Sequence, residues 1–175
     1  FILWAAENYP ADRHALIIWD HGMNWVGAIA DDTPRKEAVM ELNEIEQAVA
    51  YAAYHSGIGT FDLLGFDACL MGNLEALAAM APYADYLVVS EETEPMLGWS
   101  YGDILSRLNE NPDMSPRTLA EIIVDGYIHQ DILIVHDGLR ELVFEGASAE
   151  EALYDKSKNS TLSAVESAQV EAVLQ

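Results

Sequence analysis

The sequence predicts an α/β fold, a mostly parallel sheet flanked by helices. Three short apolar runs, at 14–20, 61–68 and 85–92, are rich in β-branched and aromatic residues, as is typical of strands that are buried on both faces. Helix-like segments at 41–57 and 72–83 lie between these runs. A strand, helix, strand, helix, strand order indicates parallel pairing with right-handed crossovers.

The first connecting helix is predicted from helical spacing. Its apolar positions recur every three or four residues up to Gly57, which is placed to cap its end: Leu42, Ile45, Ala48, Val49 and Ala52. The second segment, 72–83, is rich in Ala and Leu and is too short to be anything but a connecting helix. Residues 100–130 predict two more helices, the second of them starting at Ser115-Pro116.

The remaining chain is less regular. Residues 131–160 combine a strand-like run with a polar stretch, and 160–167 predicts a further strand followed by a helix. We find no repeat and no flexible linker, so we expect one domain over residues 1–175. Phe1 looks like a cut edge, because neither an initiator Met nor a signal pattern precedes the first strand.

The charge balance limits the partners. Thirty acidic side chains against eight basic ones give a net charge of −22. Binding to nucleic acid or to an anionic membrane relies on Lys and Arg at the contact, so we expect neither partner. A solvated acidic surface explains most of this charge, and cationic partners are favoured. No apolar run approaches the roughly 20 residues of a membrane span.

Two potentially reactive side chains follow predicted neighbouring strands. His21 comes after the first strand, in "WDHG", and Cys69 comes after the second, in "GFDACLMG". Because the carboxyl ends of parallel strands meet at one edge of a sheet, we expect these two side chains to lie close together. Cys69 is the single cysteine of the chain, so it forms no internal disulfide.

A thiol beside an imidazole is the arrangement of a cysteine nucleophile. A thiol is only a few per cent ionised at neutral pH, and the imidazole can take its proton before it attacks a carbonyl carbon. The oxyanion that forms needs donors, which we assign to the backbone N–H groups of Gly22 and Cys69. Taken alone, Cys69 is more consistent with a structural role and His21 is equally consistent with either role; their joint placement at two strand ends makes catalysis an equal alternative.

Three segments carry a resemblance to a known family. "LIIWDHG", "LLGFDACLMGNLE" and "YLVVSEETEPMLGWSY" closely resemble the clostripain family of cysteine peptidases, of the caspase-like clan that includes gingipains, legumains and separases. The resemblance covers most of residues 10–125. It implies a caspase-like three-layer sandwich whose first elements are absent before Phe1. Met23 and Met96 stand where the family has smaller or acidic residues.

The resemblance also implies roles and an activity. It makes His21 the catalytic histidine, Cys69 the nucleophile and Asp67 the acidic residue that selects a basic side chain; Glu94 is a second candidate for that contact. We therefore expect a secreted, bacterial-type endopeptidase that cleaves protein or peptide substrates after Arg or Lys. No cofactor is required, although calcium is compatible with the family.

The segment between His21 and Cys69 predicts maturation by self-cleavage. It contains the adjacent basic pair Arg35 and Lys36 in a turn-rich acidic stretch. Members of the resembled family are cleaved in such a loop after a basic residue. A pair that merely makes a turn soluble is the alternative.

Two other functions stay open on the sequence. The chain could be a non-catalytic caspase-like binding module in which His21 and Cys69 do not meet. It could also hold zinc through mixed ligands at the same edge of the sheet: Asp20, His21, Asp67 and Cys69. The sequence has no His or Cys spacing that supports such a site. Acidic loops also offer oxygen ligands for calcium, without defining a ligand set.

Overall fold

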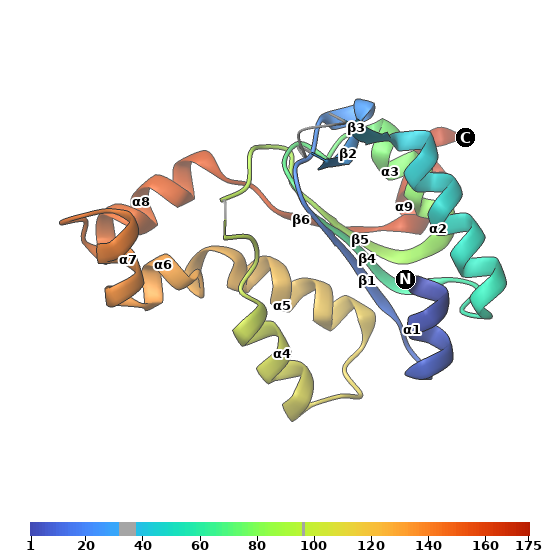
Figure 1. Ribbon diagram of the computed structural model, residues 1–175, viewed down its shortest axis with the longest axis horizontal. Helices are drawn as coiled ribbons and strands as arrows, with labels where there is room; N and C mark the ends of the chain where they lie inside the picture. Colours follow the sequence, from blue (N-terminus) through green and yellow to red (C-terminus); the bar gives the residue numbers. More distant parts are fainter. Residues whose placement is uncertain (32–37, 96) are drawn as a thin grey trace.

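The core of the protein is a four-stranded sheet. The computed structural model describes residues 1–31, 38–95 and 97–175. Within them the sheet has the order β1-β4-β5-β6, and Figure 1 shows its strands side by side. The strands are β1 (Ala15–Trp19), β4 (Phe61–Asp67), β5 (Ala84–Val89) and β6 (Ser163–Glu166). The first three are parallel and β6 runs antiparallel to β5, which confirms the predicted mostly parallel sheet.

Helices cover both faces of this sheet. One face packs against α2 (Leu42–Ser56), α3 (Leu74–Met80) with the short helix η2 (Ala81–Tyr83), and α9 (Ser167–Leu174), while α1 (Ile2–Asn8) packs against α2. The other face packs against α4 (Tyr101–Glu110) and α5 (Pro116–His129). Along β4, Leu64 and Phe66 enter the first core and Leu63 enters the second. This alternation is the period of a strand that is buried on both faces, and it produces three layers.

The helix ends agree with the sequence signals. α2 begins with a capping box formed by Glu41 and Glu44, and it ends at Gly57, whose φ of 81° is the left-handed conformation that glycine adopts readily. The Ser115 hydroxyl accepts a hydrogen bond from the Thr118 N–H at the start of α5, as its Ser-Pro start predicts.

One hairpin was not predicted. After the short helix η1 (Asn24–Val26), β2 (Gly27–Asp31) pairs with β3 (Ala38–Glu41) in an antiparallel hairpin, and both strands extend into the stretch 29–41 that we predicted to be turn-rich. Arg35 and Lys36 lie outside the described residues. The hairpin contacts α2, so it sits beside the first connecting helix and apart from the main sheet.

The prediction of a strand-like run after residue 131 is wrong. These residues form α6 (Ile132–Val135), followed by α7 (Asp137–Val143) and α8 (Ala149–Asn159). The Asp131 carboxylate caps α6 by accepting the Leu133 N–H, and the Arg140 guanidinium donates to the carbonyls of Leu133 and Ile134. Figure 1 shows this helical region projecting away from the sheet, so it is not placed to pair with the described strands. The β-branched run therefore folds locally, as a helix.

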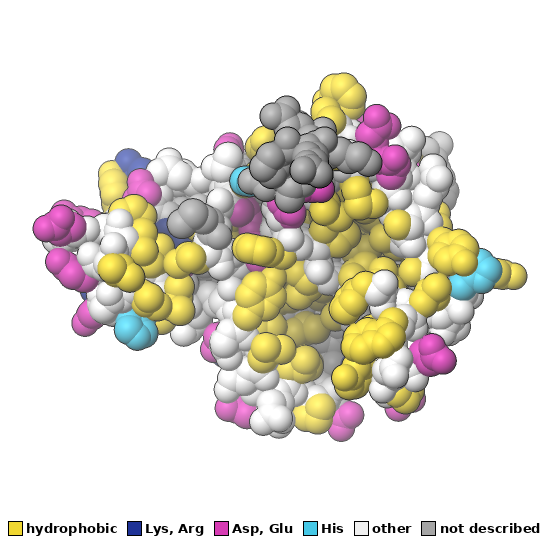
Figure 2. All heavy atoms as spheres, viewed as in Figure 1, with side chains coloured by type: hydrophobic (Ala, Val, Ile, Leu, Met, Phe, Trp, Pro, Cys, Tyr) yellow, Lys and Arg dark blue, Asp and Glu magenta, His cyan; other side chains and the backbone are white. Residues whose placement is uncertain are grey.

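The surface seen in Figure 2 has an apolar centre. Hydrophobic side chains gather in the middle of this face, where the edge strand β1 runs, and acidic side chains lie around its outline. Among the described residues, no helix is both long and apolar enough to cross a bilayer.

Candidate active site

The two reactive side chains leave neighbouring strands at one edge of the sheet. β1 and β4 are parallel neighbours in which Trp19 lies opposite Asp67, so the chain beyond each strand emerges at the same edge. His21 and Cys69 line a single pocket of about 410 Å³ there. Asp67, Glu94 and Pro95 line the same pocket, so four of the predicted site residues come together.

Cys69 lies in a tight turn. Leu70, the next residue, has a φ of 62°, a conformation that costs a non-glycine residue roughly 1–2 kcal/mol. Backbone hydrogen bonds hold the turn to the end of β5: the Leu70 N–H donates to the Glu92 carbonyl at 3.0 Å, and the Gly72 N–H donates to the Ser90 carbonyl. The Cys69 thiol is partly exposed and its Sγ accepts the Glu94 N–H at 3.1 Å. The turn therefore presents a sulfur that is both held in place and accessible.

His21 is held through its backbone alone. Its carbonyl accepts the Ile29 N–H at 3.1 Å, and its N–H donates to the Asp20 carboxylate. Gly22 forms a bridge with Ala28 of β2, so the unpredicted hairpin supports the histidine loop. The imidazole is exposed and makes no hydrogen bond to any described residue.

Gly22 is required by a close approach of two backbones. A Cβ at this position would lie 2.0 Å from the Cys69 carbonyl oxygen, far inside any normal contact. The glycine therefore allows the histidine loop to pack directly against the cysteine loop. Neither the Gly22 N–H nor the Cys69 N–H donates to another described residue. Both donors remain available to a ligand.

Asp67 is the buried acid of the pocket. Its side chain is 3 % exposed, and its Oδ2 accepts the Trp99 N–H at 2.9 Å and the Tyr101 hydroxyl at 2.7 Å. Gly98, with a φ of +69°, brings the backbone so close that a Cβ there would lie 2.4 Å from this oxygen. Charged acceptors with well-aligned donors make the stronger hydrogen bonds of proteins, so Asp67 is fixed in orientation.

Glu94 faces Asp67 in the same pocket. Its Oε2 accepts the Trp99 indole N–H at 2.9 Å, while its Oε1 is buried without a hydrogen-bond donor among the described residues. Burial, followed by the hydrogen bond and the negative charge of Asp67, raises the pKa of Glu94 from its ordinary value to about 10. Burial, followed by the hydrogen bond to Asp67, also raises the pKa of Tyr101, which stays a neutral donor.

Trp99 connects the two acids, because its backbone bonds one and its indole bonds the other. The ring has space because β4 carries Gly65 below it, where a Cβ would lie 2.5 Å from the indole. Neither Trp99 nor Tyr101 was among the predicted site residues. Both residues belong to "YLVVSEETEPMLGWSY", the third of the segments that resemble the clostripain family.

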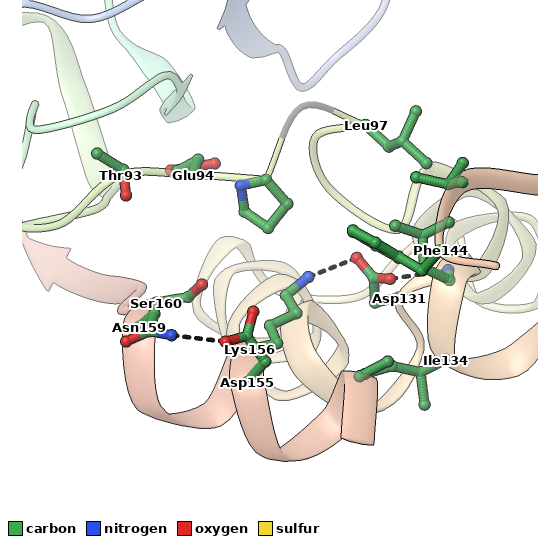
Figure 3. Close-up of a pocket in the computed structure, with 14 residues that line it drawn as sticks. Thr93, Glu94, Leu97, Asp131, Ile134, Phe144, Asp155, Lys156, Asn159 and Ser160 are labelled. Atoms are coloured by element: carbon green, nitrogen blue, oxygen red, sulfur yellow. Dashed lines mark hydrogen bonds and ion pairs between the residues drawn. The ribbon is translucent and has the colours of Figure 1, made fainter. Parts of the chain in front are cut away.

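A second pocket lies next to the one that His21 and Cys69 line. Glu94 and Pro95 line both pockets. The second pocket, on the rear side of Glu94, has a volume of about 280 Å³ and is also lined by residues of the helical region α6–α8. Figure 3 shows Lys156 reaching Asp131 across it. This ion pair is 2.6 Å long and almost fully buried, and the Lys156 ammonium lies 4.2 Å from the centre of the Tyr127 ring. Twenty-five residues separate the two partners in sequence, so no local pattern could have predicted their pairing.

The shared edge does not form a metal centre. Asp20, His21, Asp67 and Cys69 line one pocket, yet no three His, Cys, Asp or Glu side chains within residues 1–31, 38–95 and 97–175 are grouped to hold a metal ion. The zinc alternative therefore has no support in the geometry.

The layered sheet, with a histidine and a cysteine at one edge, defines an α/β protein of caspase-like fold. The model of the clostripain family matches residues 1–175, and the chain belongs to that family. It is 32 % identical over 123 residues to clostripain of Hathewaya histolytica, an alignment that spans 62 % of this chain and 23 % of that protein.

Solved structures support the same fold. A secreted C11 cysteine protease of Bacteroides thetaiotaomicron, solved with an irreversible peptide inhibitor, superposes with a TM-score of 0.66 at 23 % identity over 96 % of this chain and 43 % of that one. An inactive zymogen C11 protease of Parabacteroides distasonis gives 0.58 at 21 % identity over 97 % of this chain and 38 % of the other. The chain thus spans less than half the length of each of these relatives.

Proposed function

We propose that the chain carries the catalytic pair of a cysteine endopeptidase that cleaves peptide bonds after Arg or Lys. One observation carries the proposal: His21, Cys69 and the acids Asp67 and Glu94 line the same pocket. Membership of the clostripain family supports the peptidase class. The basic preference rests on the acids, because a buried carboxylate favours a guanidinium or ammonium group and penalises a neutral side chain that leaves it unpaired.

Each group has a defined task. His21 takes the proton of the Cys69 thiol, and the sulfur attacks the carbonyl carbon of the scissile bond. The N–H groups of Gly22 and Cys69, which have no other described acceptor, bind the oxyanion. His21 then protonates the leaving amine, and a water molecule hydrolyses the thioester. No metal or organic cofactor enters these steps.

Peptide substrates with different terminal residues test the specificity. Fluorogenic peptides ending in Arg, Lys, Asp or Leu should be cleaved in the order Arg and Lys far above Leu and Asp. The isosteric change Asp67→Asn should lower kcat/KM for the Arg peptide by about a hundredfold or more, since it removes a buried charge from a charge pair. Equal cleavage of Arg and Leu peptides would refute the basic preference.

An affinity label separates a peptidase from the alternative, a binding module. A peptidyl-Arg chloromethyl ketone should alkylate Cys69 in the native chain, detected as one added mass, and should not label the Cys69→Ala variant. An unlabelled native chain would favour a non-catalytic module. We further propose secretion, which is supported by the secreted relative of similar fold.

Self-cleavage after Arg35 or Lys36 is part of the proposal. The strands on either side, β2 and β3, pair with each other, so both fragments would stay attached after a cut. Gel electrophoresis of the purified chain should show two fragments, and the Cys69→Ala variant should remain intact. Identical intact bands would remove self-cleavage from the proposal.

A further inference from the structure

The two acids of the pocket cannot both be charged while the pocket holds no cation. One oxygen of Asp67 accepts two hydrogen bonds, from the Trp99 N–H and the Tyr101 hydroxyl. Glu94 has one donor, from the Trp99 indole, and its second oxygen is buried without any. A proton on Glu94 that is shared with Asp67 satisfies this oxygen and removes the repulsion between two desolvated carboxylates.

The other charged groups around Glu94 do not replace that proton. On the side of the first pocket and in the second core, the titratable residues near Glu94 are one carboxylic acid, one exposed imidazole, one thiol and two phenols: Asp20, His21, Cys69, Tyr101 and Tyr127. Burial raises the pKa of Tyr127, so this phenol stays neutral. On the rear side the groups are Asp131, Asp155 and Lys156. The Lys156 ammonium is committed to Asp131 at 2.6 Å.

We infer that Glu94 is a specificity-determining residue that exchanges its proton for the basic side chain of the substrate. The inference rests on the proposed peptidase function and describes how that pocket recognises its cation. The O–H bond of Glu94 breaks, the proton leaves to solvent, and the guanidinium or ammonium group takes its place between the two carboxylates. Asp67 and Glu94 together carry a charge of −1 before the exchange, and the two carboxylates with the bound cation sum to −1 after it.

This exchange makes cation recognition depend on pH. A ligand whose binding releases one proton binds about tenfold more tightly for each unit of rising pH, as long as the pH stays below the pKa of the free group. In the folded chain without substrate the Glu94 carboxyl has a pKa of about 10, so the pH dependence of binding extends across neutral pH. A neutral side chain leaves the proton in place and shows no such slope, so discrimination between Arg and Leu should grow as the pH rises.

Calorimetry on an inert form of the chain tests the exchange. The Cys69→Ala variant is titrated with an acetylated tripeptide ending in arginine amide, whose guanidinium is its single charge, in phosphate and in Tris buffer between pH 6 and 8. The difference between the two buffers gives the number of protons released. The matched control is Cys69→Ala combined with Glu94→Gln, which keeps the shape of the side chain and His21 but has no proton to release.

Each outcome decides the inference. The variant with Glu94 should release about one proton more per peptide than the Gln control, and its Kd should fall about tenfold per pH unit while that of the control stays flat. Equal proton release in the two variants, with tight binding of the Arg peptide, would overturn the proton exchange and leave the proposed specificity standing. Equal affinity for Arg and Leu peptides in both variants would overturn the acidic pocket itself, and the exchange with it.

Discussion

The two regions of the site are built differently. The acidic floor is buried and held through its own side chains: Asp67 is 3 % exposed, and its carboxylate accepts hydrogen bonds from the Trp99 backbone N–H and the Tyr101 hydroxyl. The catalytic rim is open and held by backbone: the His21 imidazole is exposed without a described partner, and Cys69 sits in a turn fixed by main-chain bonds.

On the proposed function, this difference separates substrate recognition from chemistry. The orientation of the floor is set before a substrate arrives, because each hydrogen bond to Asp67 comes from a group that the fold fixes. The rim leaves its imidazole and two N–H donors for the substrate to use. Changes at the rim should therefore alter the rate with little effect on stability, and changes at or behind the floor should alter stability, affinity or both.

Replacing His21 is the strongest way to break the rim alone. His21→Ala should lower kcat by about 10²–10⁴-fold, the usual contribution of a general base, and should leave the Tm unchanged because the side chain makes no described hydrogen bond. KM for an Arg peptide should stay within about twofold, since the floor is intact. Steady-state kinetics and thermal unfolding measure both effects.

His129→Ala is the matched control for that experiment. His129 is exposed at the end of α5 and lines neither pocket, so its loss should change neither kcat nor Tm. A His21→Ala variant that keeps full activity would show that His21 is not the general base.

The buried ion pair behind the floor predicts the largest loss of stability. Lys156→Met leaves the Asp131 carboxylate buried without its partner and should lower the free energy of unfolding by about 3 kcal/mol. Urea denaturation measures the loss. Lys158→Met, on the exposed side of the same helix, should cost less than about 1 kcal/mol although its ammonium lies 4.4 Å from the Tyr154 ring. Equal losses would show that the pair contributes nothing specific.

The sequence predicted the rim better than the floor, for a physical reason. His21 and Cys69 follow strands whose pairing is dictated by the βαβ order, and this order brings the ends of parallel strands together whatever the side chains are. The roles of Trp99 and Tyr101 depend on how α4 packs on the sheet, with Gly65 providing the space for the indole. No spacing in the sequence encodes that packing.

The prediction for the helical region α6–α8 was wrong for a related reason. Ile132–Val135 has the composition of a strand, but a strand needs a partner, and local caps from Asp131 and Arg140 stabilise a helix instead. The hairpin of β2 and β3 was missed because each of its strands has a single β-branched residue and no aromatic one, which is a weak strand signal.

Glu94 makes the stability of the floor depend on pH. The folded state keeps the Glu94 proton up to about pH 10, whereas the unfolded chain loses it near the ordinary value of 4.5. Between these values the unfolded state binds fewer protons, so stability is highest in acid and falls as the pH rises, by at most about 1.4 kcal/mol per unit. Glu94→Gln should remove this slope.

Urea denaturation of the native chain and of Glu94→Gln at pH 5, 6, 7 and 8 measures the slope as a difference, so the other titrating groups cancel. Glu91→Gln, an exposed acid in the same segment, should keep the native slope. Parallel curves for the native chain and Glu94→Gln would mean that Glu94 is already ionised, and that floor and rim do not differ in this respect.

Tyr101→Phe sharpens the comparison with the smallest expected effect. It removes one of the two donors that orient Asp67, a loss of about 1–1.5 kcal/mol for a single hydrogen bond. KM for an Arg peptide should rise about tenfold or less with kcat unchanged, because the carboxylate loses its fixed direction while the rim is untouched. Tyr83→Phe is the matched control: it removes a hydroxyl that donates to Glu46 and lines neither pocket, so it should leave KM and kcat unchanged. A fall in kcat with constant KM would mean that Tyr101 acts on the chemistry, and the separation of floor from rim would no longer hold.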